Sequence, residues 1–197
     1  MQNPLLGRVL RGIHAPEAKS IKYRTPLANV PQTMRLWSTS FVDGSAIPDA
    51  HAGVGVGQNL SPALSWSGVP ELTQELLLVI EDLDVPLPRP LLHTIALLSP
   101  TPTRISGAGS AASGRLLEGE LDTSDGVRFV PTRFKRTGYQ GPRPLPGHGP
   151  HRYDFHLYSL DRACPPARTW SNISTLLQGV SGHVTASGHL RGTMQQN

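Results

Sequence analysis

Carboxylate and imidazole side chains stand at the ends of three apolar stretches of the sequence. Asp82 and Asp84 follow a run of five apolar residues, and His93 lies near the start of the next run. His151 stands just before a third stretch, which alternates from Tyr153 onward. Because the loop between the first two runs is short, we expect antiparallel neighbours, with His93 at about the level of the aspartates. If the three ends share one sheet edge, two carboxylates and two imidazoles meet in one cleft.

Each of these side chains also has an ordinary structural interpretation. Aspartates beside a turn usually accept hydrogen bonds from backbone N–H groups. A lone histidine such as His93, on a strand face with Leu91 and Ile95, is more often a core residue with satisfied hydrogen bonds. His148, between two glycines, is expected to be exposed, and His151 could simply stack on the neighbouring tyrosine. Residue types and spacing alone therefore indicate only a soluble, β-rich domain.

Two catalytic interpretations compete with a binding role. His93, His151 and one aspartate could form a metal site of the 2-His-1-carboxylate type, but the histidines lack the local spacing HxH or HxxxH. A hydrolase needs an activated nucleophile beside a histidine, and no serine stands in a GxSxG turn. We therefore expect no catalytic activity, no bound metal and no cofactor.

Glycine and proline are frequent, with 20 and 19 residues respectively. Because proline interrupts helices and central strands, this composition favours strands joined by turns, and loops are expected at 44–63, 82–90, 107–114 and 138–150. Apolar runs and alternation predict strands at 34–42, 63–66, 76–80, 91–98, 129–134, 153–160 and 184–194. Apolar residues three and four apart predict a helix over 172–180, capped by Ser171 or Asn172. The expected fold is mainly β, an antiparallel sandwich-like domain with one or two short helices.

The basic charge is concentrated at the N-terminus. Residues 1–32 carry five basic residues and one acidic residue, which accounts for the whole net charge of +4. We therefore divide the chain into a basic N-terminal arm, 1–32, and a neutral domain, 33–197. The arm is polar and contains four prolines, so we expect it to contribute little to the core. A neutral domain lacks the basic face typical of nucleic acid binding, so no nucleic acid partner is expected.

Features of membrane and secreted proteins are missing from the sequence. No apolar run reaches the roughly 18 residues that cross a bilayer, and the first ten residues lack the apolar stretch of a secretory signal. Cys164 is the sole cysteine, so an intrachain disulfide is impossible. The cytoplasm is therefore the expected location, without stable membrane insertion.

Ordered motifs extend over most of the domain. They are Ser61–Trp66 (SPALSW), Ile80–Pro86 (IEDLDVP), His93, Gly138–Pro144 (GYQGPRP) and Gly147–Tyr153 (GHGPHRY). Together they resemble the phosphatidylethanolamine-binding protein family, in its bacterial, Raf-kinase-inhibitor-like branch, over about residues 33–194. Leu83 and Thr94 depart from the pattern, because many relatives have proline and an aromatic residue there. These departures put the shape of one pocket wall, and the ligand, in doubt.

The resemblance implies a large central antiparallel sheet, a smaller sheet, helices, and a small pocket for phosphate-like anions. Carried over by position, the ligand-binding residues would be Asp82, Asp84, Pro86, His93, Gly141, Pro142, His151 and Tyr153. Family members are mainly binding modules, so the resemblance implies a non-enzymatic binder of phosphate or a phospholipid head group that regulates a partner protein. The bacterial branch also suggests a homodimer. The alternative is a protein-interaction module that acts as a kinase or protease inhibitor and uses the arm to contact its partner.

The resemblance and the residue types together predict specific geometry in this pocket. Backbone N–H groups of the Gly141–Pro142 turn are expected to point at the anion. Asp84 and His151 are expected to meet, so that the carboxylate raises the pKa of the imidazole. Relatives often have a cis bond at the matching proline, so the Val85–Pro86 bond is expected to be cis.

Overall fold

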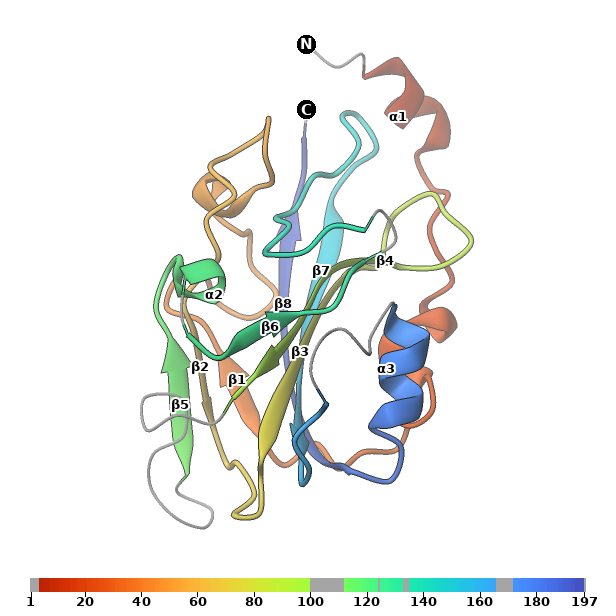
Figure 1. Cartoon of the computed structure of the whole chain (residues 1–197). Coiled ribbons are helices and arrows are strands. Elements are labelled where there is room, and N and C mark those ends of the chain that lie inside the picture. Colours follow the sequence, from red (N-terminus) through yellow and green to blue (C-terminus); the bar gives the residue numbers. More distant parts are fainter. Residues whose placement is uncertain (1–3, 100–111, 124, 133–134, 166–171, 197) are drawn as a thin grey trace.

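Two antiparallel sheets form the framework of the molecule (Figure 1). The structure, a computed structural model, describes residues 4–99, 112–123, 125–132, 135–165 and 172–196. The larger sheet has the strand order β6-β4-β3-β7-β8, and the smaller sheet has the order β1-β2-β5. The strands are β1 Arg35–Trp37, β2 Leu64–Ser67, β3 Glu75–Asp82, β4 Leu91–Leu98, β5 Ser113–Leu116, β6 Val127–Phe129, β7 His151–Leu160 and β8 Val184–Met194. The prediction of a mainly β, sandwich-like fold is confirmed.

Helices are few and short among the described residues. They are α1 Leu5–Leu10, α2 Glu120–Thr123 and α3 Ile173–Gly179, with 3-10 turns η1 Glu17–Lys19, η2 Ile21–Tyr23 and η3 Asp49–His51. The predicted capping of the last helix is confirmed for Asn172, whose side-chain oxygen accepts the backbone N–H groups of Ser174 and Thr175. In the part of the chain that the structure describes, no helix has both the length and the apolar character needed to cross a membrane.

β3 lies at the centre of the larger sheet, and all eight of its residues are buried. Alternate residues of a strand face opposite sides of its sheet. Leu76, Leu78 and Ile80 pack in the core between the two sheets. Leu77 and Val79 pack in a second core on the opposite face. This double burial explains why the strand reads as a continuous apolar run rather than an alternating one.

The N-terminal arm and α3 together cover the face of the larger sheet that the smaller sheet leaves open. Ile21 and Leu27 are 1% and 2% exposed, and they belong to the second core together with Leu77 and Val79. The expectation that the arm contributes little to the core is therefore wrong. A sheet with apolar side chains on both faces needs a covering layer on each. The arm has too few apolar residues, scattered among charged ones, to show the periodic pattern of a core element.

The first strand is much shorter than predicted. It ends at Trp37, where the sequence favoured a strand as far as residue 42. Beyond this point the hydroxyl of Ser38 donates to the backbone carbonyl of Ala63, and the hydroxyl of Ser40 accepts the Ala63 N–H. Side-chain hydrogen bonds thus replace the backbone ladder.

The edge elements also differ from expectation. β6 occupies Val127–Phe129, whereas the sequence favoured a strand at 129–134. β5 begins inside the segment 107–114 that was expected to be a loop, and the residues of that segment before 112 lie outside the described ranges. Nothing in the sequence predicted α2, which is only four residues long. Short elements of mixed polarity carry too few periods for a pattern to show.

Candidate functional site

Three strand ends meet at one edge of the larger sheet. β3 ends at Asp82, which is paired with Leu91 at the start of β4 and with Tyr153 of β7. β7 begins at His151, two residues before Tyr153. The three strand ends share one sheet edge, as expected. Of the two carboxylates and two imidazoles expected in one cleft, Asp82 and His93 line the cavity described below, whereas Asp84 and His151 are not among its lining residues.

His93 occupies an irregular point of the ladder between β3 and β4. Ile80 is paired with Thr94, but the next residue, Glu81, is paired with Leu92. His93 is therefore the extra residue of a β-bulge, which commonly re-aims a side chain. The ring of His93 meets the ring of Tyr153 edge-on, with centroids 5.4 Å apart.

The hydrogen bond made by the His93 ring shows which of its two nitrogens carries the hydrogen. Its Nδ1 lies 3.1 Å from the backbone carbonyl oxygen of Gln140. A carbonyl only accepts, so Nδ1 carries the hydrogen and the neutral ring keeps a bare acceptor at Nε2. Burial lowers the pKa of His93, although the nearby Asp82 charge raises it, so the neutral form is favoured. Nε2 is buried and has no hydrogen-bond partner among the described residues.

His151 belongs to a chain of side chains that leads away from His93. Its Nδ1 lies 2.8 Å from one carboxylate oxygen of Asp82, and its Nε2 lies 2.7 Å from Nδ1 of His148. His148 Nε2 in turn lies 3.2 Å from the carbonyl oxygen of Ile13 and must donate to it. All these bonds form together when one of the two rings, His148 or His151, carries a hydrogen on both nitrogens. Both nitrogens of His151 are thus occupied by protein groups.

Asp84 does not meet His151, contrary to expectation. Its carboxylate accepts the backbone N–H of Arg152 at 2.7 Å and two guanidinium N–H groups at 2.8 Å. Burial raises the pKa of Asp84, but the hydrogen bonds and charge of Arg152 outweigh this and lower it. Arg152 also donates to Glu17 at 3.2 Å, and His14 lies 3.6 Å from Asp84. Asp84 therefore ties the arm to the domain.

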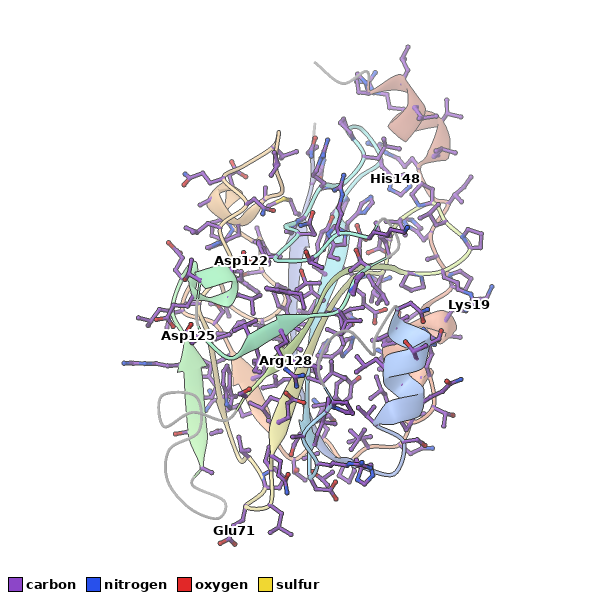
Figure 2. All side chains as sticks on the ribbon, in the orientation of Figure 1. Lys19, Glu71, Asp122, Asp125, Arg128 and His148 are labelled. Carbon is purple, nitrogen blue, oxygen red and sulfur yellow. The ribbon has the colours of Figure 1, made fainter. Side chains whose placement is uncertain are left out.

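His148 is 1% exposed, although it was expected to be exposed. It lies under the arm, below α1 (Figure 2). Gly7 of α1 approaches so closely that a Cβ there would collide with the carbonyl of Pro146 and approach the backbone nitrogen of His148. The flanking glycines suggested a free loop, but the arm packs over it.

The Gly141–Pro142 turn does not offer free N–H groups, so this expectation is also wrong. The Gly141 N–H donates to the side-chain oxygen of Asn59 at 2.9 Å, and Pro142 has no N–H. The Gln140 N–H donates to the hydroxyl of Thr94 at 3.0 Å. Thr94, a departure from the family pattern, thus helps to fix the Gln140 carbonyl that orients His93.

Gly141 is required by a close approach of two loops. A Cβ at this position would collide with the carbonyl of His51 and lie 2.7 Å from the Gly53 nitrogen. Gly141 therefore shapes the site through close packing, and its N–H is already used by Asn59.

The Val85–Pro86 bond is trans, which corrects the expectation of a cis bond. Within the described ranges the cis bond lies elsewhere, at Thr25–Pro26. The Leu87 N–H donates to the Val85 carbonyl at 2.8 Å, which closes a tight turn around Pro86. The trans isomer is favoured by about 0.5–1 kcal/mol for an ordinary X–Pro bond, and this turn gives no reason to depart from it.

A cavity of about 380 Å³ opens beside His93. Of the residues carried over from the resemblance, Asp82, His93 and Gly141 line this cavity. The others are not among its described lining residues: Asp84, Pro86, Pro142, His151 and Tyr153. Other lining residues were missed from the sequence: Gly53, Val54, Asn59, Val85, Leu91, Leu92, Thr132, Arg136, Gln140 and Arg143. Arg143 lies inside the motif Gly138–Pro144, and this position could have indicated that it belongs to the site. Arg136 and Asn59 come from loops that show no pattern.

The charges at this cavity favour an anion. Arg136 and Arg143 are exposed at its lining, and the Arg136 guanidinium lies 3.4 Å from the side-chain oxygen of Gln140. Asp82 is already bonded to His151, so it does not neutralise the two arginines. The buried Tyr153 hydroxyl has no partner among the described residues, and its pKa is raised, first by burial and then by the Asp82 charge. In the ranges that the structure covers, no three His, Cys, Asp or Glu side chains are placed to hold a metal ion.

Two known proteins are similar to this chain in sequence. A protein from Aquifex aeolicus named UPF0098 is 28% identical over 169 residues, which cover 83% of this chain and 90% of the relative. The Escherichia coli protein YbhB is 33% identical over 131 residues, 65% of this chain and 78% of that one.

Solved structures with a similar fold, and a family model that matches the sequence, point to the same family as these relatives. A homolog from Chlamydia trachomatis superposes with a TM-score of 0.68 at 28% identity, covering 86% of this chain and all of that one. Escherichia coli YbcL shares the fold with a TM-score of 0.69 at 21% identity, covering 84% of this chain and 99% of that one. The family model for phosphatidylethanolamine-binding proteins matches residues 37–195. The chain belongs to the phosphatidylethanolamine-binding protein family.

Proposed function

We propose that this protein is a non-enzymatic binding protein whose pocket takes a small phosphate-type anion. The observation that carries the proposal is the buried, unpartnered Nε2 of His93 in a cavity that two arginines line. A buried polar atom without a partner is rare and costs free energy. A ligand that supplies this partner would remove the cost on binding.

The position of the ring hydrogen on His93 narrows the class of ligand that the site can bind. Neutral His93 accepts a hydrogen bond at Nε2, so the favoured ligand carries both a negative charge and an O–H group. A monoprotonated phosphate ester has both. Its remaining oxygens can accept N–H groups from Arg136 and Arg143, and guanidinium forks match phosphate geometry.

A phospholipid head group would bind through its phosphate rather than its ammonium. Asp82 is the acidic residue that the described lining offers to an ammonium, and its carboxylate already accepts hydrogen bonds from His151 and from the Asp84 N–H. This leaves the phosphate as the group that the cavity is built to hold.

The side chains support binding rather than catalysis. Nucleophilic catalysis needs a hydroxyl or thiol beside a base. Thr132 lines the cavity, but its hydroxyl donates to the Arg136 carbonyl, and the hydroxyl of Thr94 accepts the Gln140 N–H. Neither hydroxyl is hydrogen-bonded to a histidine or carboxylate.

Titration with methyl phosphate, followed by NMR between pH 5 and pH 9, tests the proposal. The affinity is expected to fall about tenfold per pH unit above the second pKa of the ester, which is about 6, because the ligand proton that His93 accepts is lost. Methyl sulfate, which has no such proton, is expected to bind more weakly at pH 6 and with little change up to pH 9. Equal affinities of the two anions at pH 6 would contradict the assignment of His93.

Two variants locate the site. Arg143→Gln is expected to weaken methyl phosphate binding by about 1.5–3 kcal/mol, the range for a charged hydrogen bond, and His93→Ala by about 1 kcal/mol. Arg115→Gln is the matched control, since Arg115 is exposed on β5 of the smaller sheet and makes the same change of charge. Undiminished binding in both site variants would place the anion elsewhere.

A second candidate function is that of an interaction module that inhibits a kinase or protease. The observation that favours it is the exposed apolar surface of α1, where Leu5, Leu6 and Val9 are 60%, 58% and 77% exposed. Inhibition assays against panels of carboxypeptidases and protein kinases, with the wild type and Val9→Asp, test it. Inhibition that is lost in Val9→Asp but kept in Arg143→Gln would assign the activity to α1.

A further inference from the structure

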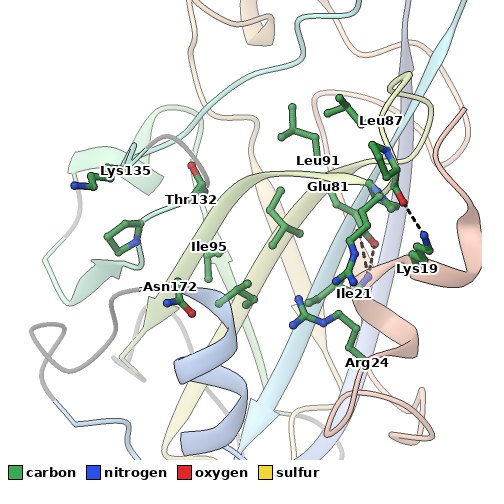
Figure 3. Close-up of a pocket in the computed structure, with 16 residues that line it drawn as sticks. Lys19, Ile21, Arg24, Glu81, Leu87, Leu91, Ile95, Thr132, Lys135 and Asn172 are labelled. Carbon is green, nitrogen blue, oxygen red and sulfur yellow. Dashed lines mark hydrogen bonds between the residues drawn. The ribbon is translucent and has the colours of Figure 1, made fainter.

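A second cavity, of about 600 Å³, lies between the arm, the start of β4 and the N-terminal end of α3 (Figure 3). It shares Leu91, Leu92 and Thr132 with the first cavity. It contains neither His93 nor the two arginines of the proposed anion site. Its volume lies inside the range of about 300–1,000 Å³ that is typical of small-molecule sites.

The wall of this cavity is mostly hydrocarbon. The apolar residues that line it are Ile21, Leu87, Leu91, Leu92, Ile95 and Ile173, with Pro88, Pro90 and Pro131. Prolines have no backbone N–H, so this wall offers few hydrogen bonds to a bound peptide backbone. An alkyl chain needs none and gains from leaving water.

Four cations surround the hydrocarbon wall. They are Lys19, Arg24, Arg89 and Lys135, and none of them makes an ion pair within the described ranges. The Lys19 ammonium donates to the carbonyl of Pro88 at 3.1 Å, which leaves two of its hydrogens free. Burial lowers the pKa of Arg24, the positive charge of Arg89 lowers it further, and the negative charge of Glu81 raises it, so Arg24 lies near charges of both signs.

The acidic residue of the described lining does not balance these charges. Glu81 accepts hydrogen bonds from the hydroxyl of Ser20 and from the Ile21 N–H, and it lies 2.9 Å from Nε2 of His156. Its carboxylate is buried and committed to these partners. One carboxylate against four cations leaves a net positive charge beside the apolar wall of the described lining.

We propose that this cavity binds a free, single-chain anionic amphiphile, with its hydrocarbon chain against the apolar wall and its acidic head near Arg24 and Arg89. The hydrocarbon chain matches a wall that has few donors, and the acidic head matches cations that outnumber the carboxylate of the described lining. This inference does not depend on the proposed phosphate site, because the two sets of charged residues are different.

Calorimetric titration with sodium laurate, below its micelle concentration, tests the proposal. One laurate is expected to bind per chain. Acetate, which keeps the head alone, and dodecyl maltoside, which keeps the chain without the charge, are each expected to bind at least about tenfold more weakly. Equal binding of laurate and dodecyl maltoside would overturn the role of the cations, and binding of several laurates per chain would indicate nonspecific adsorption.

Variants separate this site from the first cavity. Arg24→Gln and Arg89→Gln are each expected to weaken laurate binding by about tenfold or more, as expected for a lost charged hydrogen bond. Leu87→Gln is expected to weaken laurate binding because it places a polar group in the apolar wall. Arg115→Gln and Arg143→Gln are expected to leave it unchanged, and loss of laurate binding in Arg143→Gln would move the ligand to the first cavity.

The remaining outcomes are also decisive. Melting temperatures within a few degrees of the wild type establish that the variants fold. Full laurate binding in the double variant Arg24→Gln/Arg89→Gln would overturn the proposal. An acidic peptide of alternating leucine and aspartate that bound more tightly than laurate would assign the cavity to a protein partner instead.

Discussion

The two faces of the larger sheet are covered in different ways. Between the sheets, the even-numbered residues of β3 from Leu76 to Ile80 meet other hydrocarbon side chains, such as Trp66 and Phe155. On the opposite face, Glu75 and Glu81 flank the two central apolar residues of the same strand. One face is an apolar core, and the other combines apolar contacts with buried charges.

Each of the two buried glutamates of β3 has specific hydrogen-bond partners. Glu75 accepts hydrogen bonds from Arg128 and from the Cys164 N–H, at 2.7 Å for the latter. Glu81 accepts from Ser20 and the Ile21 N–H of the arm. A buried charge is stable only beside its own partners, whereas an apolar face accepts any hydrocarbon layer. The second face therefore selects the segment that covers it, and the comparison predicts that removal of that segment is costly.

Deletion of residues 1–32 is expected to give the largest effect. It removes Ile21 and Leu27 from the second core, at about 1.5–3 kcal/mol for each buried side chain, and it leaves Glu81 without its arm partners. Because 1 kcal/mol shifts the midpoint by roughly 2–4 °C at this size, the melting temperature should fall by about 10 °C or more. Scanning calorimetry of the full chain and of 33–197 measures this. A fall of only a few degrees would show that the arm contributes little to the stability of the domain.

Truncation of neighbouring β3 residues sharpens the comparison. Leu77→Ala and Leu78→Ala remove the same atoms from opposite faces, and both residues are 0% exposed. Each is expected to cost about 2–5 kcal/mol. The cost should be smaller at Leu77, because the arm is joined by loops and can settle into the space more easily than the paired strands of the smaller sheet. Urea denaturation compares the two, and a larger loss at Leu77 would show that the arm is the more rigid cover.

The sequence predicted the central strands well because their patterns are strong. β3, β4, β7 and β8 lie within about two residues of the expected positions, since long apolar or alternating runs leave few other structures open. The part of the second face's cover that the arm supplies could not be predicted, because it depends on hydrogen bonds between residues far apart in the sequence. Nothing in the sequence indicates that Ser20 and Glu81, which are 61 positions apart, are in contact in the folded chain.

The candidate site divides in the same way. Asp82, His93 and Gly141 could be predicted because they stand at strand ends or inside distinctive motifs. No sequence pattern predicted that Arg136 would line the cavity, since a single basic residue in a loop is compatible with many structures. The pairing of Asp84 was misjudged because Arg152 reaches it with its backbone and its side chain together.

Replacement of a single arm hydroxyl isolates the polar contribution of the second face. Ser20→Ala removes a hydrogen bond to the buried Glu81 carboxylate, and a bond to a charged group contributes about 1.5–3 kcal/mol. The free energy of unfolding from urea denaturation measures the loss. Ser45→Ala, on an exposed turn, is the control with the same atoms removed. A loss below that of the control would mean that the second face is held by its apolar contacts alone.

Acid titration gives the smallest effect and tests whether charges fasten the arm. The Arg152 hydrogen bonds lower the pKa of Asp84 in the folded state relative to the reference of about 3.9 for an unfolded chain. The unfolded state therefore binds the proton more readily, so the stability that Asp84 contributes is fully present above about pH 4 and is lost as the pH falls through the folded pKa. Asp84→Asn removes this contribution at every pH, so its unfolding free energy should fall below that of the wild type at pH 6 and approach it at about pH 2. Equilibrium unfolding at both pH values, with Asp43→Asn at an exposed turn as the control, measures the difference. A constant gap between Asp84→Asn and the wild type at both pH values would show that the carboxylate acts by its shape and hydrogen bonds, and not by its charge.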